Sequence, residues 1–320
     1  MGARDELYEH WRALLDVDPP RSKSLLITIF GDSIAPHGGT VLVSDLIKLL
    51  APFGINDRLV RTSVFRLHRE GWFSARREGR LSAYSLTPQG LRRFTAAYKR
   101  VYESPSGSWA GNWMLVCVPD VIRKQGRHGT LSRELVWAGF GQMAPGVFVH
   151  PQTDPTTIEE IIRAAGPENP VSVLAARNIE QLSTAPIQDL VRQCWDLEGV
   201  AAGYLSFLQR FEGISKLLKN PAAIAFRDAF AVRTLLIHFF RRVTLHDPLL
   251  PAELLPGDWP GHRAYELCRN VYSRTYKNAE MHLREMLDSN RGRLPDAAAF
   301  FYERFGGLSQ ESSTAMLRSH

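Results

Sequence analysis

The spacing of hydrophobic residues predicts three helices in the first 70 positions, followed by a β-hairpin. Apolar residues recur at intervals of three and four over residues 22–34, 44–50 and 57–70, which places them on one face of each helix. Residues 72–75 and 81–86 are then predicted to form two strands, joined by a basic turn that contains a glycine. A helical group followed by a hairpin is the element order of a winged helix-turn-helix.

Residues with capping preferences mark the ends of these helices. Ser44 and Asn56 are predicted to cap the second and third helices, because their side chains accept hydrogen bonds from free backbone N–H groups. Gly71 is predicted to stop the third helix, and Thr87-Pro88 to open a fourth. A β-branched run at residues 40–43 predicts one further short strand.

The pattern changes after a Ser/Pro/Gly linker at residues 104–108. Four strands are predicted, at residues 113–118, 140–143, 147–150 and 171–175. Two helices are predicted between them, at residues 130–138 and 156–165. The resulting order βαββαβ is that of a ferredoxin-like sandwich.

From about residue 186 onward the chain is predicted to be wholly helical. Long amphipathic stretches cover residues 187–218, 222–243 and 262–287, and a Pro-rich connector at residues 246–261 separates the last two. The expected fold class is therefore α+β, with an N-terminal winged helix-turn-helix, a ferredoxin-like βαββαβ middle domain and an all-helical C-terminal domain. The expected domains are a polar leader (1–20), the winged helix (21–103), the middle domain (109–180), a C-terminal effector and dimerisation domain (186–308) and a tail (309–320).

Positive charge is concentrated in the first of these domains. The whole chain has a net charge of +6, whereas residues 56–100 contain eleven Lys or Arg and three Asp or Glu. The excess in this one module is larger than the net charge of the chain, so the remainder is slightly acidic. A basic module of this kind indicates an anionic partner.

The predicted helix at residues 57–70 has two different faces. Val60, Val64 and Leu67 fall on the face that packs on the other helices. The opposite face carries Arg58, Arg61, Thr62, Phe65, Arg66 and Arg69. Arginine suits guanine edges and phosphates, and Thr or Phe suits a thymine methyl group. No acid is expected at a spacing of four to neutralise these arginines within the helix. The alternative is an ordinary solvated face.

The tip of the hairpin is also basic, with Arg76, Arg77 and Arg80. A basic hairpin beside a basic helix can follow a phosphate backbone while the helix enters the major groove. The combination is more specific than either part and predicts double-stranded operator DNA as the partner. Two such modules reading a palindromic site gain affinity, so a homodimer is expected.

Several motifs in the chain resemble the PaaX family of repressors. They lie at residues 24–32, 60–67, 70–73, 137–141, 144–149, 247–256 and 258–261. The resemblance covers nearly the whole chain and implies a GntR-like winged helix, a ferredoxin-like middle domain and a helical C-terminal domain. It further implies repression of aromatic-acid catabolic genes, phenylacetate degradation above all, with phenylacetyl-coenzyme A as the effector that releases the operator.

Two groups of residues are candidates for binding an acyl-CoA effector. The first surrounds the Pro-rich connector and comprises Arg241, Arg242, His246 and Trp259. The second is a basic loop with Arg123, Lys124 and Arg127. Arginines would bind phosphates and a tryptophan would stack on an aromatic group. Each feature also has a structural explanation, because cations favour helix C-termini and a tryptophan in a Pro-rich turn often anchors packing.

Two enzymatic alternatives remain open from the sequence. The middle domain resembles small CRISPR-associated nucleases whose first strand ends in a metal-binding aspartate, here Asp120, but a single carboxylate is a poor magnesium site. An acyl-CoA enzyme in the C-terminal half would need a nucleophile, and the G-x-S-x-G motif is absent. We therefore expect no enzyme, no catalytic residue, no metal and no cofactor other than the effector.

Cysteine spacing and hydropathy indicate whether the chain has a zinc motif, a signal peptide or a membrane span. Cys117, Cys194 and Cys268 are too far apart for a zinc motif, so free thiols are expected. The start, Met1 to Glu9, lacks the apolar core of a signal peptide, and no apolar stretch is long enough to cross a membrane. The expected location is the cytoplasm.

Overall fold

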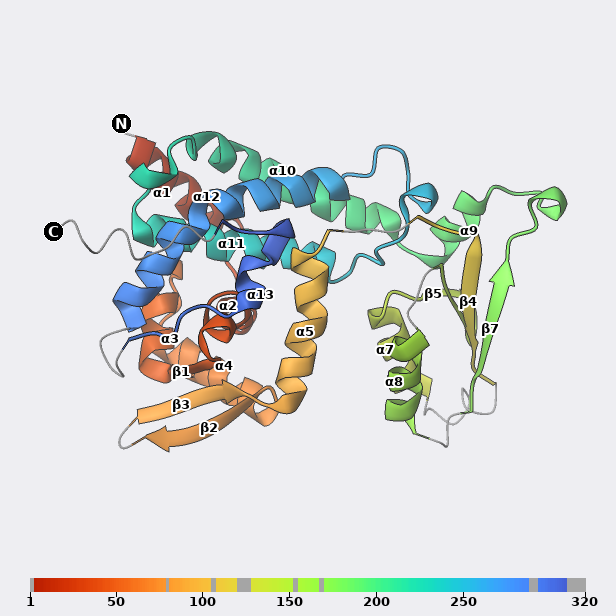
Figure 1. Ribbon diagram of the computed structural model, residues 1–320, viewed down its shortest axis with the longest axis horizontal. Coiled ribbons are helices and arrows are strands. Elements are labelled where there is room, and N and C mark those ends of the chain that lie inside the picture. Colours follow the sequence, from red (N-terminus) through yellow and green to blue (C-terminus); the bar gives the residue numbers. More distant parts are fainter. Residues whose placement is uncertain are drawn as a thin grey trace. The chain divides into compact units, whose positions relative to one another are not determined.

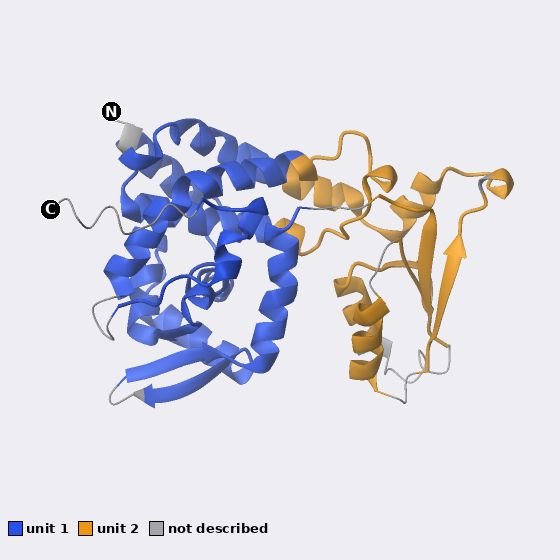
Figure 2. Cartoon of the chain, viewed as in Figure 1, with its two compact units in different colours: residues 1–104, 206–242, 263–320 blue, residues 105–205, 243–262 orange. Residues whose placement is uncertain are grey.

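The computed structural model describes residues 3–78, 81–104, 108–119, 128–151, 155–166, 170–287 and 293–309 (Figure 1). The chain divides into two compact units (Figure 2). Unit 1 comprises Met1–Ser104, Ser206–Arg242 and Arg263–His320, and unit 2 comprises Pro105–Leu205 and Val243–His262. The helices of the C-terminal third are thus shared between the two units.

The segment predicted as a polar leader forms helix α1 (Ala3–Val17) and packs into unit 1. Its apolar face is buried, with Trp11 only 1% exposed. The indole Nε1 of Trp11 lies 3.3 Å from Oδ1 of Asp228, and its ring contacts that of Phe53. The low mean hydropathy of the segment hid this face, since three apolar positions on one side are enough to anchor a helix.

The predicted helix at residues 22–34 is present, but it changes type along its length. It begins as α2 (Ser22–Ile29), continues as the π-helical turn η1 (Phe30–Ile34) and ends in the 3-10 turn η2 (Ala35–His37). Gly38 follows with a φ of +85°, a conformation that terminates the helix at low cost only for glycine.

One of the two predicted helix caps in the next segment is present. Strand β1 (Thr40–Leu42) leads into α3 (Val43–Leu50), the 3-10 turn η3 (Ala51–Phe53) and α4 (Asp57–Arg69). Asn56 caps α4 as predicted, because its side chain accepts from the backbone N–H of Leu59 at 3.0 Å. The cap predicted at Ser44 is wrong: α3 already begins at Val43, and the Ser44 hydroxyl is buried without a hydrogen-bond partner.

The predicted hairpin follows α4 and completes a three-stranded antiparallel sheet. Strands β2 (Phe73–Glu78) and β3 (Leu81–Leu86) pair along their whole length, with Phe73 opposite Leu86 and Glu78 opposite Leu81. Strand β1 pairs with the other edge of β3. Helix α5 (Pro88–Tyr102) comes next, capped as predicted by Thr87, whose hydroxyl accepts from the N–H of Gly90 at 2.9 Å.

Unit 2 contains a four-stranded antiparallel sheet with two helices on one face. Its elements are β4 (Asn112–Cys117), α7 (His128–Trp137), β5 (Gly141–Ala144), β6 (Val147–His150), α8 (Pro155–Ala165) and β7 (Ser172–Arg177). The order βαββαβ is the predicted one, and the strands lie in the order β5-β6-β4-β7. Val116, Leu135, Phe148 and Ile158 form the core between sheet and helices.

The opposite face of this sheet is partly covered by later segments of unit 2. The 3-10 turn η4 (Glu180–Leu182) and α9 (Ile187–Cys194) follow β7, and the 3-10 turn η6 (Ala252–Leu254) comes from the Pro-rich connector. Trp113 and Trp195 stack in this second cluster, and the Trp195 indole donates to the carbonyl of Gly139 at 2.9 Å.

The long helix predicted over residues 187–218 is divided in two. After α9, helix α10 (Leu197–Leu217) starts at a new cap, where the Asp196 side chain accepts from the N–H of Gly199 at 2.9 Å. The remaining elements are η5 (Pro221–Ala223), α11 (Phe226–Thr244), α12 (Gly261–Leu287), α13 (Ala299–Tyr302) and η7 (Arg304–Gly306).

A buried ionic network joins these helices inside unit 1. Asp32 lies 3.0 Å from Nε of Arg233 and 3.1 Å from Nη1 of Arg304, and all three side chains are at most 1% exposed. Arg233 reaches Glu280 at 2.7 Å, and Glu280 reaches His37 at 2.7 Å. The hydroxyls of Tyr102 and Tyr272 also donate to Asp32, at 2.7 and 3.0 Å. Buried charges need such partners, so the network fixes η1, α11, α12 and η7 relative to each other.

Candidate nucleic-acid interface and ligand cavity

Helix α4 has the two faces that the sequence predicts. Val60, Val64 and Leu67 are at most 1% exposed and pack on the other helices of unit 1. The candidate DNA-binding side chains of the opposite face are all exposed: Arg58, Arg61, Thr62, Phe65, Arg66 and Arg69. Phe65 is 58% exposed, which is unusual for a phenylalanine and leaves its ring available for contact with a partner.

One expectation about this face is wrong. Asp57 lies four positions before Arg61, and its Oδ1 is 2.5 Å from Nε of Arg61. The carboxylate therefore neutralises one of the arginines in the absence of DNA. Both side chains are more than half exposed, so the pair contributes little to stability and is easily exchanged for a phosphate.

The hairpin presents its arginines on opposite faces. Arg76 is paired with Ala83 and Arg77 with Ser82, and both arginines are exposed. Because successive residues of a strand point to opposite sides, the two cannot approach the same surface together. Arg80 lies outside the described residues.

Helix α4 is attached to α2 at its middle and at its C-terminal end. The hydroxyls of Ser22 and Ser63 are 2.8 Å apart, and Lys23 pairs with Glu70 at 2.5 Å, which holds α4 against α2. Gly71 has a φ of +75° and turns the chain sharply into β2. Movement of α2 therefore moves the basic face of α4.

The first group of candidate effector residues is divided between the two units. Arg241 and Arg242 belong to unit 1, where Arg242 pairs with Asp18 at 3.0 Å. His246 and Trp259 belong to unit 2, where His246 is exposed and Trp259 is half-buried. The second candidate group, Arg123, Lys124 and Arg127, lies outside the described residues.

Trp259 and Asp247 have structural roles within unit 2. The Trp259 ring packs edge-on against Tyr204, with ring centroids 6.0 Å apart. Asp247 accepts from the Tyr204 hydroxyl at 2.6 Å and from the N–H of Leu249 at 2.8 Å. Asp247 thus holds the turn after α11.

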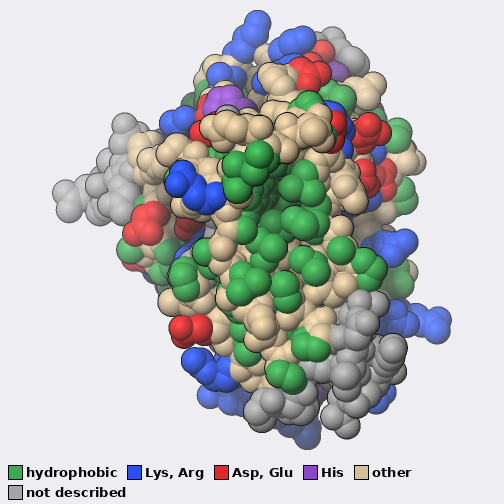
Figure 3. All heavy atoms as spheres, turned by 90° about the vertical axis from the view of Figure 1, so that its right-hand side faces the viewer, with side chains coloured by type: hydrophobic (Ala, Val, Ile, Leu, Met, Phe, Trp, Pro, Cys, Tyr) green, Lys and Arg blue, Asp and Glu red, His purple; other side chains and the backbone are tan. Residues whose placement is uncertain are grey.

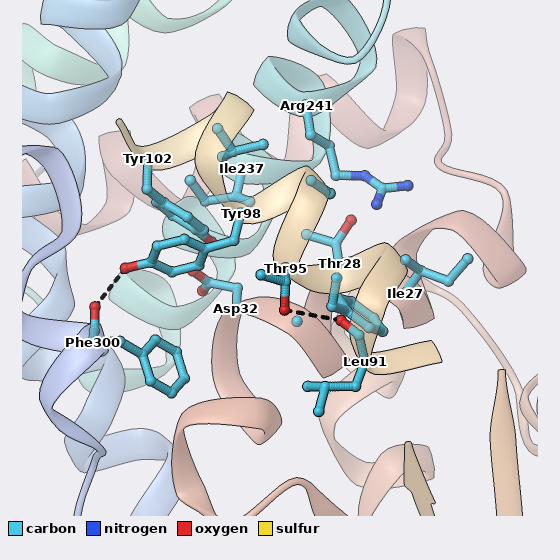
Figure 4. A pocket seen from close by; sticks show the side chains of 14 residues that line it. Ile27, Thr28, Asp32, Leu91, Thr95, Tyr98, Tyr102, Ile237, Arg241 and Phe300 are labelled. Carbon is cyan, nitrogen blue, oxygen red and sulfur yellow. Dashed lines mark hydrogen bonds between the residues drawn. The ribbon is translucent and has the colours of Figure 1, made fainter. Parts of the chain in front are cut away.

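Unit 1 contains an open cavity of about 310 Å³ that the sequence did not predict (Figure 4). Four helical segments supply its walls: α2 with the start of η1, α5, α11 and α13. The lining is mostly apolar and consists of Ile27, Thr28, Gly31, Asp32, Leu91, Phe94, Thr95, Ala97, Tyr98, Val101, Tyr102, Ile237, Arg241 and Phe300. A hydrogen bond from the Tyr98 hydroxyl to the carbonyl of Phe300 joins two of the walls.

Of the candidate effector residues that the structure describes, Arg241 alone lines this cavity. Its Nε is buried without a hydrogen-bond partner, and its Nη2 lies 3.4 Å from the hydroxyl of Ser24. Burial lowers the pKa of Arg241 to about 10, so the guanidinium is charged at neutral pH. A sequence pattern could name this arginine but not the cavity, because the walls come from four distant segments.

The described part of the chain contains no group of three His, Cys, Asp or Glu placed to hold a metal ion. Asp120, the residue on which a nuclease would depend, is not among the described residues. Cys117, Cys194 and Cys268 are free thiols, as expected, and burial raises the pKa of the Cys194 thiol to about 11. None of the helices in the described ranges is long and apolar enough to span a bilayer.

Family models match three successive parts of the chain. The model of the PaaX-like protein matches residues 21–90, that of the PaaX central Cas2-like domain matches residues 106–188, and that of the PaaX-like C-terminal domain matches residues 195–285. An uncharacterized protein of Mycobacterium tuberculosis has a similar solved structure, with 24% identity and a TM-score of 0.50. That match covers 82% of this chain and 98% of the other, and it shows the fold alone.

The chain is also similar to a curated regulator. It is 36% identical over 294 residues to the transcriptional repressor PaaX of Escherichia coli, covering 92% of each chain. With a mixed α+β fold and a basic surface helix, this similarity defines a repressor of transcription. The chain belongs to the PaaX family. The relative's name is that of a regulator of transcription, which is the class expected from the sequence.

Proposed function

We propose that this protein binds operator DNA in the cytoplasm through a winged helix-turn-helix, with α4 as the recognition helix and β2–β3 as the wing. The single observation that carries the proposal is the exposed basic face of α4 beside a basic hairpin. A helix of this kind enters the major groove, where arginines reach guanine edges and phosphates. Thr62 and Phe65 lie in the middle of the face, where they suit thymine methyl groups.

We infer that the protein acts as a homodimer assembled through a ferredoxin-like unit 2. Strand β7 is an edge strand, and Val173 and Leu174 on it are 42% and 51% exposed. Figure 3 shows hydrophobic side chains gathered over a broad area of one face. An exposed apolar patch beside an open sheet edge is typical of a protein–protein contact. A dimer places two recognition helices on the two halves of a palindromic operator.

The ligand that we propose as effector is an aryl-acyl-CoA such as phenylacetyl-coenzyme A, and the controlled genes are those of aromatic-acid catabolism. Family membership and the presence of a ligand-sized cavity in unit 1 support this proposal. The effector must bind more tightly to the form that does not fit the operator, since equal affinity for both forms would shift nothing.

The test is operator binding by fluorescence anisotropy, using the promoter region upstream of the protein's own gene. Arg58→Ala and Arg66→Ala are expected to weaken binding, by about 1–3 kcal/mol in discrimination for an arginine that reads a base. Arg269→Ala, on the exposed surface of α12, is the matched control and should leave affinity unchanged. Unchanged affinity in both α4 variants, with the fold intact, rejects α4 as the recognition helix.

A further inference from the structure

Helix α11 carries four arginines, and only Arg241 lacks a carboxylate partner in the described structure. The others each lie near one: Arg227 is 3.7 Å from Asp228, Arg233 is 3.0 Å from Asp32 and Arg242 is 3.0 Å from Asp18. Arg241 makes one long contact, of 3.4 Å, to the Ser24 hydroxyl. An unpaired charge withdrawn from water is costly, so this site is completed when an anion or another acceptor enters it.

The cavity beside Arg241 has a polar end and an aromatic end. Figure 4 shows the guanidinium of Arg241 at one end and the rings of Tyr98, Tyr102 and Phe300 at the other. The floor is buried, with Ile237 only 3% exposed. The rim is open to solvent, because Leu91 is 56% exposed. A ligand therefore enters past Leu91. Its polar group then faces Arg241 and its apolar part faces the aromatic rings.

The volume of the cavity limits the size of the ligand. A cavity of about 150 Å³ is enough for benzene, and this one has about 310 Å³. The space accommodates one aromatic ring with a short acyl chain. This volume lies at the lower end of the range for ligand pockets. The cavity therefore cannot enclose a nucleotide in addition to the aromatic ring and its acyl chain.

The geometry points to a binding site for the aryl-acyl end of an aromatic acid, with its carbonyl or carboxylate oxygen accepting hydrogen bonds from Arg241. The ring lies against Phe94, Tyr98 and Phe300. This inference rests on the proposed function, in which such a ligand releases the protein from DNA. The oxygen belongs either to a free carboxylate or to a thioester, whose coenzyme part then remains outside the rim.

A ligand in this cavity touches the elements that carry the DNA-contacting surface. Phe94 lines the cavity and packs edge-on against Trp72, which directly precedes β2, with ring centroids 5.7 Å apart. A Cβ added at Gly31 would lie 2.5 Å from the Phe94 ring, so the ring has no free space on that side. A ligand that displaces the Phe94 ring therefore also displaces Trp72 and the start of β2.

The test is calorimetry on the full chain with three probes: phenylacetate, phenylacetyl-coenzyme A and coenzyme A alone. Arg241→Met is expected to weaken binding at least about tenfold, or about 1.4 kcal/mol, because it removes a charge-assisted hydrogen bond. It should not lower the melting temperature, since a methionine replaces a half-buried charge that has no carboxylate partner in the described structure. Arg227→Met, on the same helix but away from the cavity, should bind as the wild type does.

Each result either shows whether the ligand is the free acid or the thioester, or contradicts the proposed site. Binding of phenylacetate that Arg241→Met weakens supports the site with the free acid as ligand. Binding of the thioester alone, weakened in the same way, supports it with the thioester. The inference is overturned if coenzyme A binds as well as its thioester, if Arg241→Met binds like the wild type, or if neither aryl ligand binds.

A second pair of variants tests the site without touching the arginine. Ala97→Leu fills the cavity and should raise the ligand concentration needed for operator release at least about tenfold, whereas Ala96→Leu, one position away and outside the lining, should not. Equal release by both variants contradicts the site. Operator affinity of the wild type without ligand is measured separately, so a failure of DNA binding is distinguished from a failure of the cavity.

Discussion

Asp32 and Arg233 form an ion pair sealed from solvent, with Oδ2 of the aspartate 3.0 Å from Nε of the arginine. The pair ties the turn after α2 to the middle of α11. It also stands next to the ligand cavity, because Asp32 contributes to the lining. The rigidity of the cavity floor thus depends on charges that are distant in the sequence.

Removing the cation of this pair should be strongly destabilising. Arg233→Met leaves Asp32 and Glu280 buried without their shared partner, and we expect the free energy of unfolding to fall by about 3–5 kcal/mol. The measurement is urea denaturation followed by circular dichroism. Arg263→Met, which breaks an exposed pair with Glu212, is the control and should cost less than about 1 kcal/mol. Similar losses of stability in the two variants would contradict the importance of the network.

Acid should destabilise the fold through two buried histidines. Burial, aided by Arg241 and Arg242, lowers the pKa of His238 to about 3, and burial with Arg227 lowers that of His282 to about 4. Both are neutral when folded, whereas in the unfolded chain they bind protons below about pH 6.5. Their contribution is therefore complete above that pH and decreases as the pH falls toward 4.

The size of the acid effect follows from linkage. Each histidine contributes at most about 1.4 kcal/mol per pH unit between its unfolded and folded pKa values. His238→Gln should roughly halve the slope of unfolding free energy against pH between 6 and 4.5. Glu280 acts in the same direction at lower pH: burial raises its pKa, but Arg233 and His37 outweigh burial and lower it to about 2. An unchanged slope in His238→Gln would show that this histidine titrates normally.

The contact between Asp57 and Arg61 should reduce affinity for DNA. Asp57→Asn keeps the shape of the side chain but removes the charge that competes with phosphate for Arg61. We expect operator and non-specific affinity to rise severalfold together, since a phosphate contact carries no sequence information. Anisotropy titrations with operator and scrambled duplexes measure both. A rise for the operator alone would mean that Arg61 reads a base.

The wing arginines should differ in their effect on salt dependence. Removing an arginine that binds a phosphate reduces the slope of log K against log salt by about 0.9. Because Arg76 and Arg77 point to opposite faces of the hairpin, only one of Arg76→Ala and Arg77→Ala should flatten the slope. Binding measured at several salt concentrations separates the two. Equal changes in both variants would mean that DNA touches both faces of the hairpin.

Local patterns predicted the helices and strands of the candidate DNA-binding module well. The apolar face of α4, its cap at Asn56 and the hairpin after Gly71 all follow from spacing and backbone preference, which act within a few residues. The failures near this module are also local: Ser44 lies inside α3, and Asp57 was overlooked as the partner of Arg61.

The cavity and the buried network depend on contacts between segments far apart in the chain. Arg233 and Glu280 look like ordinary charged residues of amphipathic helices, and nothing in their neighbourhoods marks them as buried. Arg241 was singled out for its nearness to the connector, but its significance comes from Thr28, Phe94 and Phe300, which no spacing rule brings together. Helix α1 differs from these, because its few apolar positions were hidden by the low mean hydropathy of the segment; its anchor, Trp11, contacts Asp228 on α11.

Helix α2 contacts α4 through Ser22 and lines the cavity through Ile27 and Thr28. If the cavity takes the effector, ligand and operator bias the same helix, and each weakens the other by an equal factor. An operator that holds the repressor tightly then raises the ligand concentration required for release, and a weak one lowers it. One repressor with several promoters would consequently switch them on in sequence, ordered by operator strength, as the aromatic acid accumulates.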